Sequence, residues 1–467
     1  MASTTRPLPS ASTSSGSGAS SARSTYDFSH AKLRDAAYDS IPPATRRTIH
    51  SDVADALVAL SDRDGPPAAG LVAFHHLAAN RLEEAISWFQ RAADDAYRVH
   101  AYVEAMRSLD QALDLVPSLP PAVRHHWELE LLSIAPAMLA GVDGYGTERM
   151  HRTHRRAIDG AADLGVELQP AFVRSMVMSA LCRDEFAVAA DMAGQLASQA
   201  EPNDDQGLLV ESHYLRGISA FWAADLPNAR RHFESAVAQF DDSTRRQHHV
   251  RYGHDPQVVC LSRLANTMWF LGEEDLAAQT SARAVELAES VAHPLSHDTA
   301  IIFACVLAVD LADHIRLREL EPRLGALGMD SVPHAVKHQA VLGLLEVVDG
   351  HAAKGLERIA SARERCGSRN FYPGFRMTVQ RLMLAAHAAA DDPRGGLVAC
   401  CEARDLRSTP LWDAEVHRLQ ASFLGSLGSG SGVVEAELAA GEAIARRRGA
   451  EAHLRSLART RKLLSLR

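Results

Sequence analysis

The sequence predicts an all-α fold: a tetratricopeptide-like solenoid of helix pairs wound into a right-handed superhelix. Three observations lead to this prediction. Apolar residues recur at intervals of three and four residues along nearly the whole chain, strand patterns are nearly absent, and short Gly, Pro, Asp or Asn stretches interrupt the helical pattern. Ala and Leu dominate the apolar residues, which suits closely packed helices because both enter a helix at little cost.

Small side chains recur where successive helices would touch. A tetratricopeptide unit of about 34 residues needs small residues at three positions, where two helices approach closely, and a larger apolar residue that fills the gap between pairs. Four stretches reproduce that order at intervals of twelve, four and three residues. They are Ala73, Ala85, Phe89 and Ala92; Gly217, Ala229, Phe233 and Ala236; Ala265, Ala277, Ser281 and Ala284; and Gly343, Gly355, Ile359 and Ala362.

The repeat is degenerate. Ala105, Leu109 and Ala112 repeat the second half of the pattern only 20 residues after Ala85, so these two sets must share a helix and describe three successive helices. Later sets lie further apart than a standard repeat. A helical bundle without true repeats therefore stays open as an alternative.

Composition divides the chain into three parts. Residues 1–25 form a Ser-, Gly- and Ala-rich tail that we expect to be disordered, residues 26–64 form junction helices, and residues 65–467 hold the array. The polar segment 241–257 is predicted to be a loop, and residues 425–432 to be a flexible loop within the array. The second loop does not bind phosphate in the P-loop manner, because no strand precedes it and no lysine follows it.

Charge and cysteine usage exclude several classes of partner and location. The formal charge of −9, without a concentrated basic stripe, makes nucleic acid an unsuitable partner. No apolar run approaches the roughly 20 residues that span a bilayer, so we expect no membrane insertion. Six cysteines form no CxxC pair, which predicts reduced thiols and a cytoplasmic location. Only four of the 49 basic residues are lysines, a bias typical of GC-rich, bacterial genomes.

The segment YDFSHAKLRDAAYDSIPPATRRTIHSDVADAL, residues 26–57, resembles the end of the winged-helix region in bacterial STAND-type signalling ATPases. These include the large LuxR-type regulators and the adenylate cyclase–ATPase–tetratricopeptide proteins, in which the segment joins the ATPase to a C-terminal repeat array. The matching residues are Phe28, Ser29, His30, Leu33, Arg34, Ala36, Ala37, Tyr38, Ser40, Pro43, Arg46 and His50. The stretches YGHDPQVVCLSRLANTMWFLGEEDLA and WDAEVHRLQASFLGSLG resemble the array of the same family.

The chain departs from that family in the parts that carry activity. It contains no GxxxxGK[ST] loop, no cyclase module and no C-terminal helix-turn-helix, so the resemblance implies neither ATP hydrolysis nor cyclase activity here. HExxH and GxSxG motifs are also absent. Adjacent histidines point about 100° apart on a helix, and His151 and His154 stand among four arginines, which opposes a cation. We therefore expect no enzyme activity, no cofactor and no metal site.

The segment RYGHDP offers the best candidates for contact with a partner or ligand. Arg251, Tyr252, His254 and Asp255 supply cationic, aromatic and anionic groups, and loops on a rigid array commonly carry contacts. The alternative is a structural turn in which Asp255 caps a helix that begins near Pro256.

Two tryptophans are further candidates. Trp222 and Trp269 fall near the middles of predicted first helices, where an aromatic ring either lines the inner groove or belongs to the core. The basic C-terminal stretch 445–467 reads as an amphipathic helix that caps the array.

These observations favour a non-catalytic scaffold in bacterial signalling or transcriptional regulation. A protein or peptide would bind in the concave groove, and a P-loop ATPase or other signalling protein is the partner that the resemblance implies. One alternative is a small-molecule-sensing domain that acts on an ATPase or transcription factor, for which we expect a closed, partly apolar pocket rather than an open, charged groove. A second alternative is a truncated remnant of a STAND regulator, which unpaired apolar surface on the helix at 31–40 would support.

Overall fold

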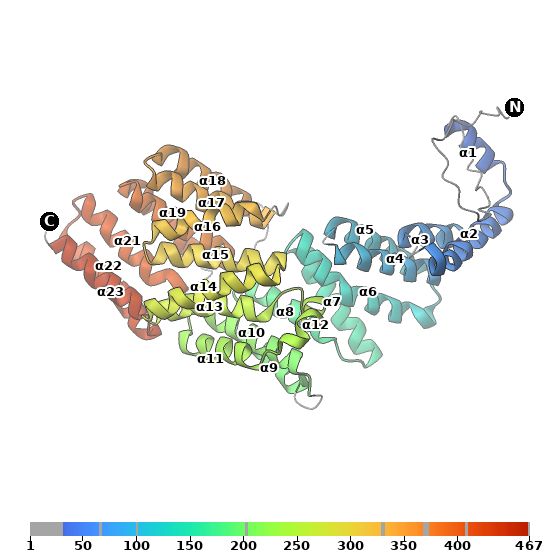
Figure 1. Cartoon of the computed structure of the whole chain (residues 1–467), viewed down its shortest axis with the longest axis horizontal. Helices are drawn as coiled ribbons and strands as arrows, with labels where there is room; N and C mark the ends of the chain where they lie inside the picture. The colour runs from blue at the N-terminus through green and yellow to red at the C-terminus, as the bar shows by residue number, and fades with distance from the viewer. Residues whose placement is uncertain are drawn as a thin grey trace, which may run out of the picture.

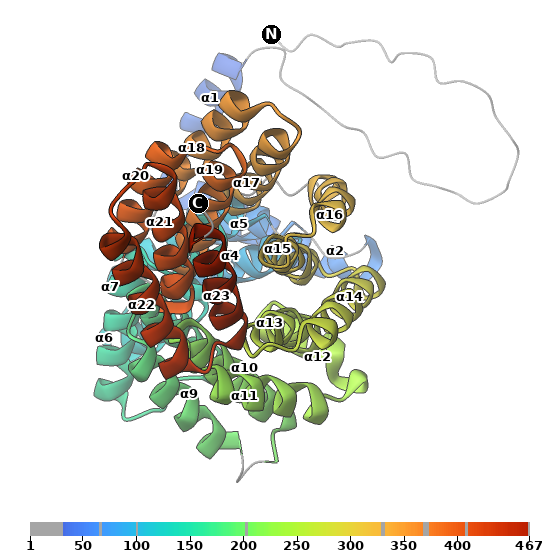
Figure 2. The same ribbon diagram turned by 90° about the vertical axis from the view of Figure 1, so that its left-hand side faces the viewer.

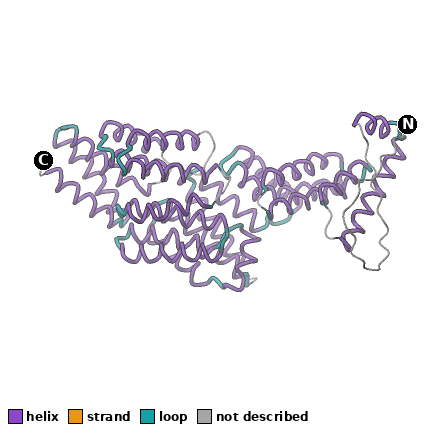
Figure 3. The backbone as a smooth tube through the Cα atoms, turned by 45° about the horizontal axis from the view of Figure 1, so that its top comes forward, coloured by secondary structure: helices purple, strands orange, loops and turns teal. Residues whose placement is uncertain are grey.

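The structure, a computed structural model, describes residues 31–64, 68–99, 101–200, 204–327, 332–367, 373–406 and 410–465. Within these ranges every regular element is a helix, as Figure 3 shows. The predicted all-α class is confirmed. The tail predicted at residues 1–25 and the motif residues Phe28, Ser29 and His30 lie outside the described residues.

Consecutive helices pack against one another along the chain and form a solenoid of helical hairpins. The N-terminal part consists of α1 (Ala31–Asp39), α2 (Pro43–Asp64), α3 (Ala69–Ala78), α4 (Leu82–Arg98), α5 (Tyr102–Leu115), the short 3-10 helix η1 (Val116–Ser118), α6 (Pro121–Val142) and α7 (Glu148–Leu164). The middle part consists of α8 (Pro170–Cys182), α9 (Phe186–Ala200), α10 (Gln206–Trp222), α11 (Leu226–Gln239), η3 (Asp242–Thr244), α12 (Arg245–Tyr252), α13 (Pro256–Phe270), α14 (Glu274–Val291), α15 (Pro294–Asp310) and α16 (His314–Ala326). The C-terminal part consists of α17 (Val332–Val348), α18 (Ala352–Gly367), α19 (Pro373–Ala389), α20 (Pro393–Asp405), η4 (Pro410–Trp412), α21 (Asp413–Ser426), α22 (Ser431–Arg448) and α23 (Glu451–Ser465).

The small residues of the predicted repeat sit where helices touch. A Cβ atom on Gly217 would lie 2.6 Å from the ring of Phe233, and one on Gly343 would lie 2.6 Å from Ile359. Each of these glycines therefore lets a large side chain of the partner helix press against its backbone. In the remaining predicted sets most small residues are fully buried; Ala92 is only partly buried, and its neighbour Ala93 takes the core position.

The molecule has two cores of different size. Helices α2 to α7, here called the arm, extend away from the rest of the molecule in Figure 1 and have their own apolar core between Ala73 and Met150. Helices α8 to α23, here called the closed turn, share one large core that runs from Val177 to Leu457. A small cluster of Leu132, Ala157 and Phe172 lies between the two.

The closed turn returns on itself, so that its last helix, α23, contacts α13. In Figure 2, α23 lies beside α21 and α22 and meets α13. The ring of His453 on α23 packs edge-on against Phe270 and Trp269, with ring centroids 5.2 and 5.5 Å apart. Arg455 donates from Nη2 to the carbonyl of Gly272 at 2.6 Å. The C-terminal helix α23 is thus the last element of the array and also joins it back to α13.

Residues 241–257 are not the loop that their polarity predicted. They contain η3 and the two-turn helix α12, which ends where Gly253 adopts a left-handed φ of 72°. The guanidinium of Arg245 lies over the ring of Phe240, 4.9 Å from the ring centroid. The His248 ring packs edge-on against the same ring. These contacts with Phe240 hold a polar helix that sequence hydropathy alone does not reveal.

The glycine- and serine-rich segment at 425–432 is helical at both ends and turns between them. Helix α21 continues to Ser426 and α22 begins at Ser431, and Gly428 turns the chain between them with a φ of 74°. Among the described residues, no helix is both long and apolar enough to cross a membrane.

Three residues of the junction motif meet in space. The hydroxyl of Tyr38 shares a hydrogen bond of 2.8 Å with Nε2 of His50, and the guanidinium of Arg46 lies 5.0 Å from the Tyr38 ring centroid. His50 in turn shares a 2.8 Å hydrogen bond with Nδ1 of His75 on α3. The motif therefore connects α1, α2 and α3.

Candidate functional site

The predicted capping role of Asp255 is observed. This side chain is fully buried, and its Oδ1 accepts a hydrogen bond of 2.8 Å from the backbone N–H of Val258 at the start of α13. Its Oδ2 accepts from Arg245 and, at 3.0 Å, from His249. Burial by itself would raise the pKa of Asp255, but hydrogen bonds from His249 and Val258 and the charge of Arg245 hold it below its usual range. Its own backbone N–H donates to Ser296 on α15 at 2.7 Å.

Only one of the four RYGHDP candidates reaches the surface. Tyr252 and His254 are buried, and the Tyr252 ring packs on His248 with centroids 4.6 Å apart. Arg251 is partly exposed and forms an ion pair of 2.7 Å with Asp205. A partner that approached this segment would therefore touch Arg251 and not the other three side chains.

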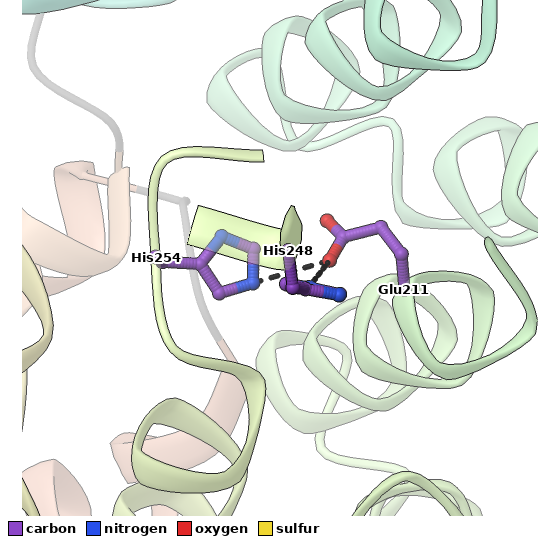
Figure 4. A group of neighbouring side chains, drawn as sticks. All are labelled: Glu211, His248 and His254. Carbon is purple, nitrogen blue, oxygen red and sulfur yellow. Dashed lines mark hydrogen bonds and ion pairs between the residues drawn. The ribbon is translucent and has the colours of Figure 1, made fainter. Parts of the chain in front are cut away.

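His254 belongs to a buried polar node that the sequence did not reveal. Figure 4 shows His248 and His254 converging on the carboxylate of Glu211. The Glu211 Oε2 atom lies 3.2 Å from Nε2 of His248 and 3.1 Å from Nε2 of His254. The other oxygen, Oε1, accepts from Nε of Arg174 at 2.6 Å, and Arg174 also donates to the hydroxyl of Tyr145 at 3.1 Å. The node joins α8, α10 and α12 to the turn between α6 and α7.

The neighbours of Glu211 favour its charged form. Burial would raise the pKa of Glu211, but the charges of His254 and Arg174 and the hydrogen bonds from both histidines hold it well below its usual range. Burial lowers the pKa of His254, in spite of the opposing influence of Glu211. The Glu211 carboxylate and the Arg174 guanidinium therefore face each other as a buried ion pair.

The node has donor atoms for a metal ion but lacks the charge balance. Glu211, His248 and His254 offer ligand atoms within 4.8 Å of one another, a set that suits Zn²⁺. Arg174 already neutralises Glu211, however, and its Nη2 lies 3.1 Å from Nδ1 of His254. A divalent cation would add uncompensated positive charge in a buried site. We interpret the node as a structural lock that holds α12 against α8 and α10.

Sequence reasoning missed Glu211 and Arg174 because 37 and 80 residues separate them from their partners His248 and His254. One signal was available. Glu211 interrupts the apolar stretch LLVESHYLRGISAFW, and a carboxylate on a buried helix face requires a buried partner.

The two candidate tryptophans occupy different places in the closed turn. Trp269 is almost fully buried and packs on His453 where the turn closes. Trp222 is also buried, with its ring centroid 6.3 Å from those of Phe303 and Trp412. Trp222 differs from Trp269 in that it lines a cavity.

This cavity lies among helices of the closed turn and has a volume of about 170 Å³. Its walls come from α10, α13, α15, α17 and α19. The apolar lining residues are Trp222, Ile302, Phe303, Val306 and Phe375. The polar ones are Arg263, Thr299, Lys337 and Thr378. We call it the Arg263 pocket.

A second hollow of about 390 Å³ lies between α18, α19 and α20. Its lining includes Arg363 and Glu402, which form an ion pair with each other. Because Arg363 is already paired with Glu402, this hollow offers less to an anionic ligand than the Arg263 pocket does.

No family profile matches the chain. The chain is similar to Uncharacterized protein R02095 of Rhizobium meliloti (strain 1021), with 23% identity over 456 residues; the match covers 92% of this chain and 42% of that protein. The chain thus spans less than half the length of this relative.

Two solved structures match the chain over most of its length but with low similarity. A chain of the APC/C hetero-tetramer Cut9-Hcn1 matches with a TM-score of 0.41 and 13% identity, over 91% of this chain and 94% of that one. The P58(IPK) TPR domain matches with a TM-score of 0.21 and 10% identity, over 90% and 98%. At such scores the neighbours add no detail, and the helical-hairpin fold stands on the helix packing described above.

Proposed function

We propose that this chain is a non-catalytic scaffold that binds a signalling or transcriptional regulatory protein, and that α2 and α3 at the end of the arm provide the docking face. The observation that carries this proposal is a row of exposed apolar side chains. Leu71, Phe74 and Leu77 on α3 are 47%, 53% and 36% exposed, and their spacing of three residues places them along one side of the helix.

The face extends to the neighbouring helix. Ile49 on α2 is also exposed, and the next residue, His50, meets the Phe74 ring with centroids 5.8 Å apart. On α1, Ala36, Ala37 and Tyr38 are exposed as well. Contiguous apolar surface of this kind marks sites of protein–protein contact, so the face at α1 to α3 suits an apolar protein surface.

The resemblance of residues 26–57 to the ATPase-adjacent segment of STAND proteins favours a P-loop ATPase as the occupant. In those proteins this segment joins an ATPase module to the repeat array. Here residues 31–57 of this segment form α1 and most of α2 beside the exposed face, which supports an ATPase or another signalling protein bound at the arm and a cytoplasmic location for the complex.

Site-specific photo-cross-linking tests this proposal. A benzophenone side chain placed at Phe74 of the full chain should cross-link one protein in cells, and mass spectrometry should identify it as a P-loop ATPase or other signalling protein. The matched control carries the same group at Leu276 on the outer helix α14, which is 40% exposed. Equal cross-linking at both positions, or none at Phe74, would contradict the proposal.

A second candidate function is small-molecule sensing. The Arg263 pocket is a partly apolar cavity bounded by five helices of the closed turn, which is the feature expected of a sensor. This observation does not compete with docking at the arm, because the two sites lie in different parts of the molecule.

A further inference from the structure

Arg263, on α13, is a buried cation without a counter-ion. Its side chain is 8% exposed. Its guanidinium donates from Nη1 to the carbonyl of Val259, one turn earlier in the same helix, at 3.1 Å. It lies over the ring of Phe303, 4.6 Å from the centroid, and 5.7 Å from that of Tyr214. The Nε atom is buried with no hydrogen-bond partner, and no carboxylate in the described part of the chain forms an ion pair with this arginine.

Three other buried or partly buried arginines of the closed turn differ from Arg263 in this respect. Arg174 pairs with Glu211, Arg381 pairs with Asp310 at 2.9 Å, and Arg418 pairs with Glu415 at 2.6 Å. Since arginine stays protonated in proteins, an arginine buried without an acid is unfavourable unless something else supplies the negative charge. Arg263 is therefore placed to receive an anion.

The second cation of the pocket is already neutralised. The ammonium of Lys337 pairs with Oδ2 of Asp298, and Oδ1 of Asp298 lies 2.8 Å from Nδ1 of His334. The pocket thus has one uncompensated positive charge, that of Arg263. This charge balance favours a ligand that carries a single negative charge.

The volume and lining limit the rest of the ligand. A cavity of about 170 Å³ is close in size to the engineered cavity of about 150 Å³ that holds benzene. Trp222, Phe303, Ile302 and Val306 present rings and aliphatic groups to it. The body of the ligand must therefore be small and apolar, about the size of one six-membered ring.

We infer that the Arg263 pocket binds a small organic monocarboxylate, with the carboxylate on the guanidinium of Arg263 and an apolar body against Trp222, Phe303 and Val306. A planar carboxylate matches the fork of donors on arginine. The inference rests on the second candidate function, small-molecule sensing, and is independent of docking at the arm. Because the pocket is bounded by five helices of the closed turn, an occupant would hold those helices together.

Benzoate is the probe for this site, and benzamide is its neutral counterpart of the same shape. Titration of the full chain by calorimetry, together with tryptophan fluorescence to follow Trp222, should detect benzoate binding. Benzamide should bind at least about tenfold more weakly, because it cannot neutralise the guanidinium. Bound benzoate should also raise the melting temperature. Absence of binding up to about 10 mM benzoate, or equal affinity for the two probes, would overturn the inference.

Two variants test the placement of the ligand. Arg263→Gln removes the charge and should abolish the preference for benzoate over benzamide, whereas the control Arg283→Gln, at an exposed position on α14, should leave both affinities unchanged.

Val306→Phe fills the pocket without removing the charge and should reduce benzoate affinity about tenfold or more. Circular dichroism checks that each variant is folded. Unchanged benzoate affinity in either pocket variant would contradict this placement, and cross-linking from position 74 reports on the scaffold proposal separately.

Discussion

The arm and the closed turn are built from the same kind of helix pair but differ in how their contacts are completed. In the arm each helix contacts mainly its neighbours along the chain, and α2 and α3 at its end leave Leu71 and Phe74 exposed. In the closed turn the last helix returns to α13, so that His453 covers Trp269 and Phe270. A linear array thus keeps an open apolar end that a partner can cover, whereas a closed array buries its end contacts and can enclose a small cavity.

The two parts also differ in buried charge. The closed turn buries several ion pairs among its inner helices, such as Arg174 with Glu211 and Arg381 with Asp310, whereas ion pairs of the arm such as Arg81 with Asp55 are exposed. Exposed pairs contribute little to stability, and removal of one member of a buried pair is strongly destabilising. We therefore expect substitutions that remove a charge to destabilise the closed turn more than the arm.

The largest effect is expected from Glu211→Gln. This change leaves the buried guanidinium of Arg174 without its counter-charge and should lower the free energy of unfolding by about 3 to 5 kcal/mol. Urea denaturation of the full chain measures the loss, and hydrogen exchange should show that α8, α10 and α12 open before α4 and α5 do. The control Glu286→Gln, at an exposed position on α14, should change stability by less than about 0.5 kcal/mol. Similar losses for both variants would argue against the node as a lock.

A pair of glycine substitutions contrasts close helix contact with open space. In Gly355→Ala the new Cβ would meet the carbonyl oxygen of Gly343 and lie 2.6 Å from Cγ2 of Val347, so we expect a loss of about 2 to 3 kcal/mol. In Gly70→Ala on α3 the new Cβ has nothing within 4 Å, and the higher helix propensity of alanine should add about 0.5 to 1 kcal/mol. Thermal denaturation of the two variants should therefore shift in opposite directions. Shifts of the same sign would show that the repeat contacts are looser than the structure indicates.

Acid should weaken the closure of the turn through His453. Burial lowers the pKa of this histidine to about 4, in spite of the nearby Glu415, and Arg381 and Arg418 also disfavour its protonation. The unfolded chain has a histidine pKa near 6.5, so between these values the folded state binds fewer protons. The stabilisation is therefore complete above about pH 6.5 and is lost as the pH falls toward 4, with about 2 kcal/mol lost at pH 5.

His453→Phe keeps a ring against Trp269 and removes this titration. Comparison of its free energy of unfolding with that of the wild type at pH 7 and pH 5 should show a smaller loss in the variant, and hydrogen exchange at pH 5 should place the difference in α23. His126→Phe, which changes an exposed histidine of α6 in the arm, serves as the control and should follow the wild type. Equal pH dependence in all three proteins would contradict the role assigned to His453.

The smallest effect is expected at the docking face. Phe74→Ser removes a side chain that is 53% exposed and should change stability by less than about 0.5 kcal/mol. Phe270→Ser removes a fully buried ring in the closed turn and should cost about 3 to 5 kcal/mol. If Phe74→Ser also destabilised the chain by several kcal/mol, this residue would belong to the core and could not serve as the docking face.

The sequence by itself determined the helical class and the local contacts of the repeat. Gly217 and Phe233 belong to one predicted set of repeat positions and Gly343 and Ile359 to another, and in the structure the two members of each set lie against each other. The sequence also offered a cap of α13 by Asp255 as the alternative to a binding role, and this cap is observed. These features depend on residues at most a few tens of positions apart, where helical periodicity fixes which side chains share a face.

Only the tertiary structure decided which side chains are buried together across the closed turn. Arg174 and His254 are 80 residues apart, and Arg455 and Gly272 are 183 residues apart. The direction in which a solenoid curves results from small rotations added over many helix pairs, and no local pattern reports their sum. For this reason the sequence indicated Trp222 and Trp269 as equivalent candidates, whereas the fold places one beside a cavity with an unpaired arginine and the other beneath the helix that closes the turn.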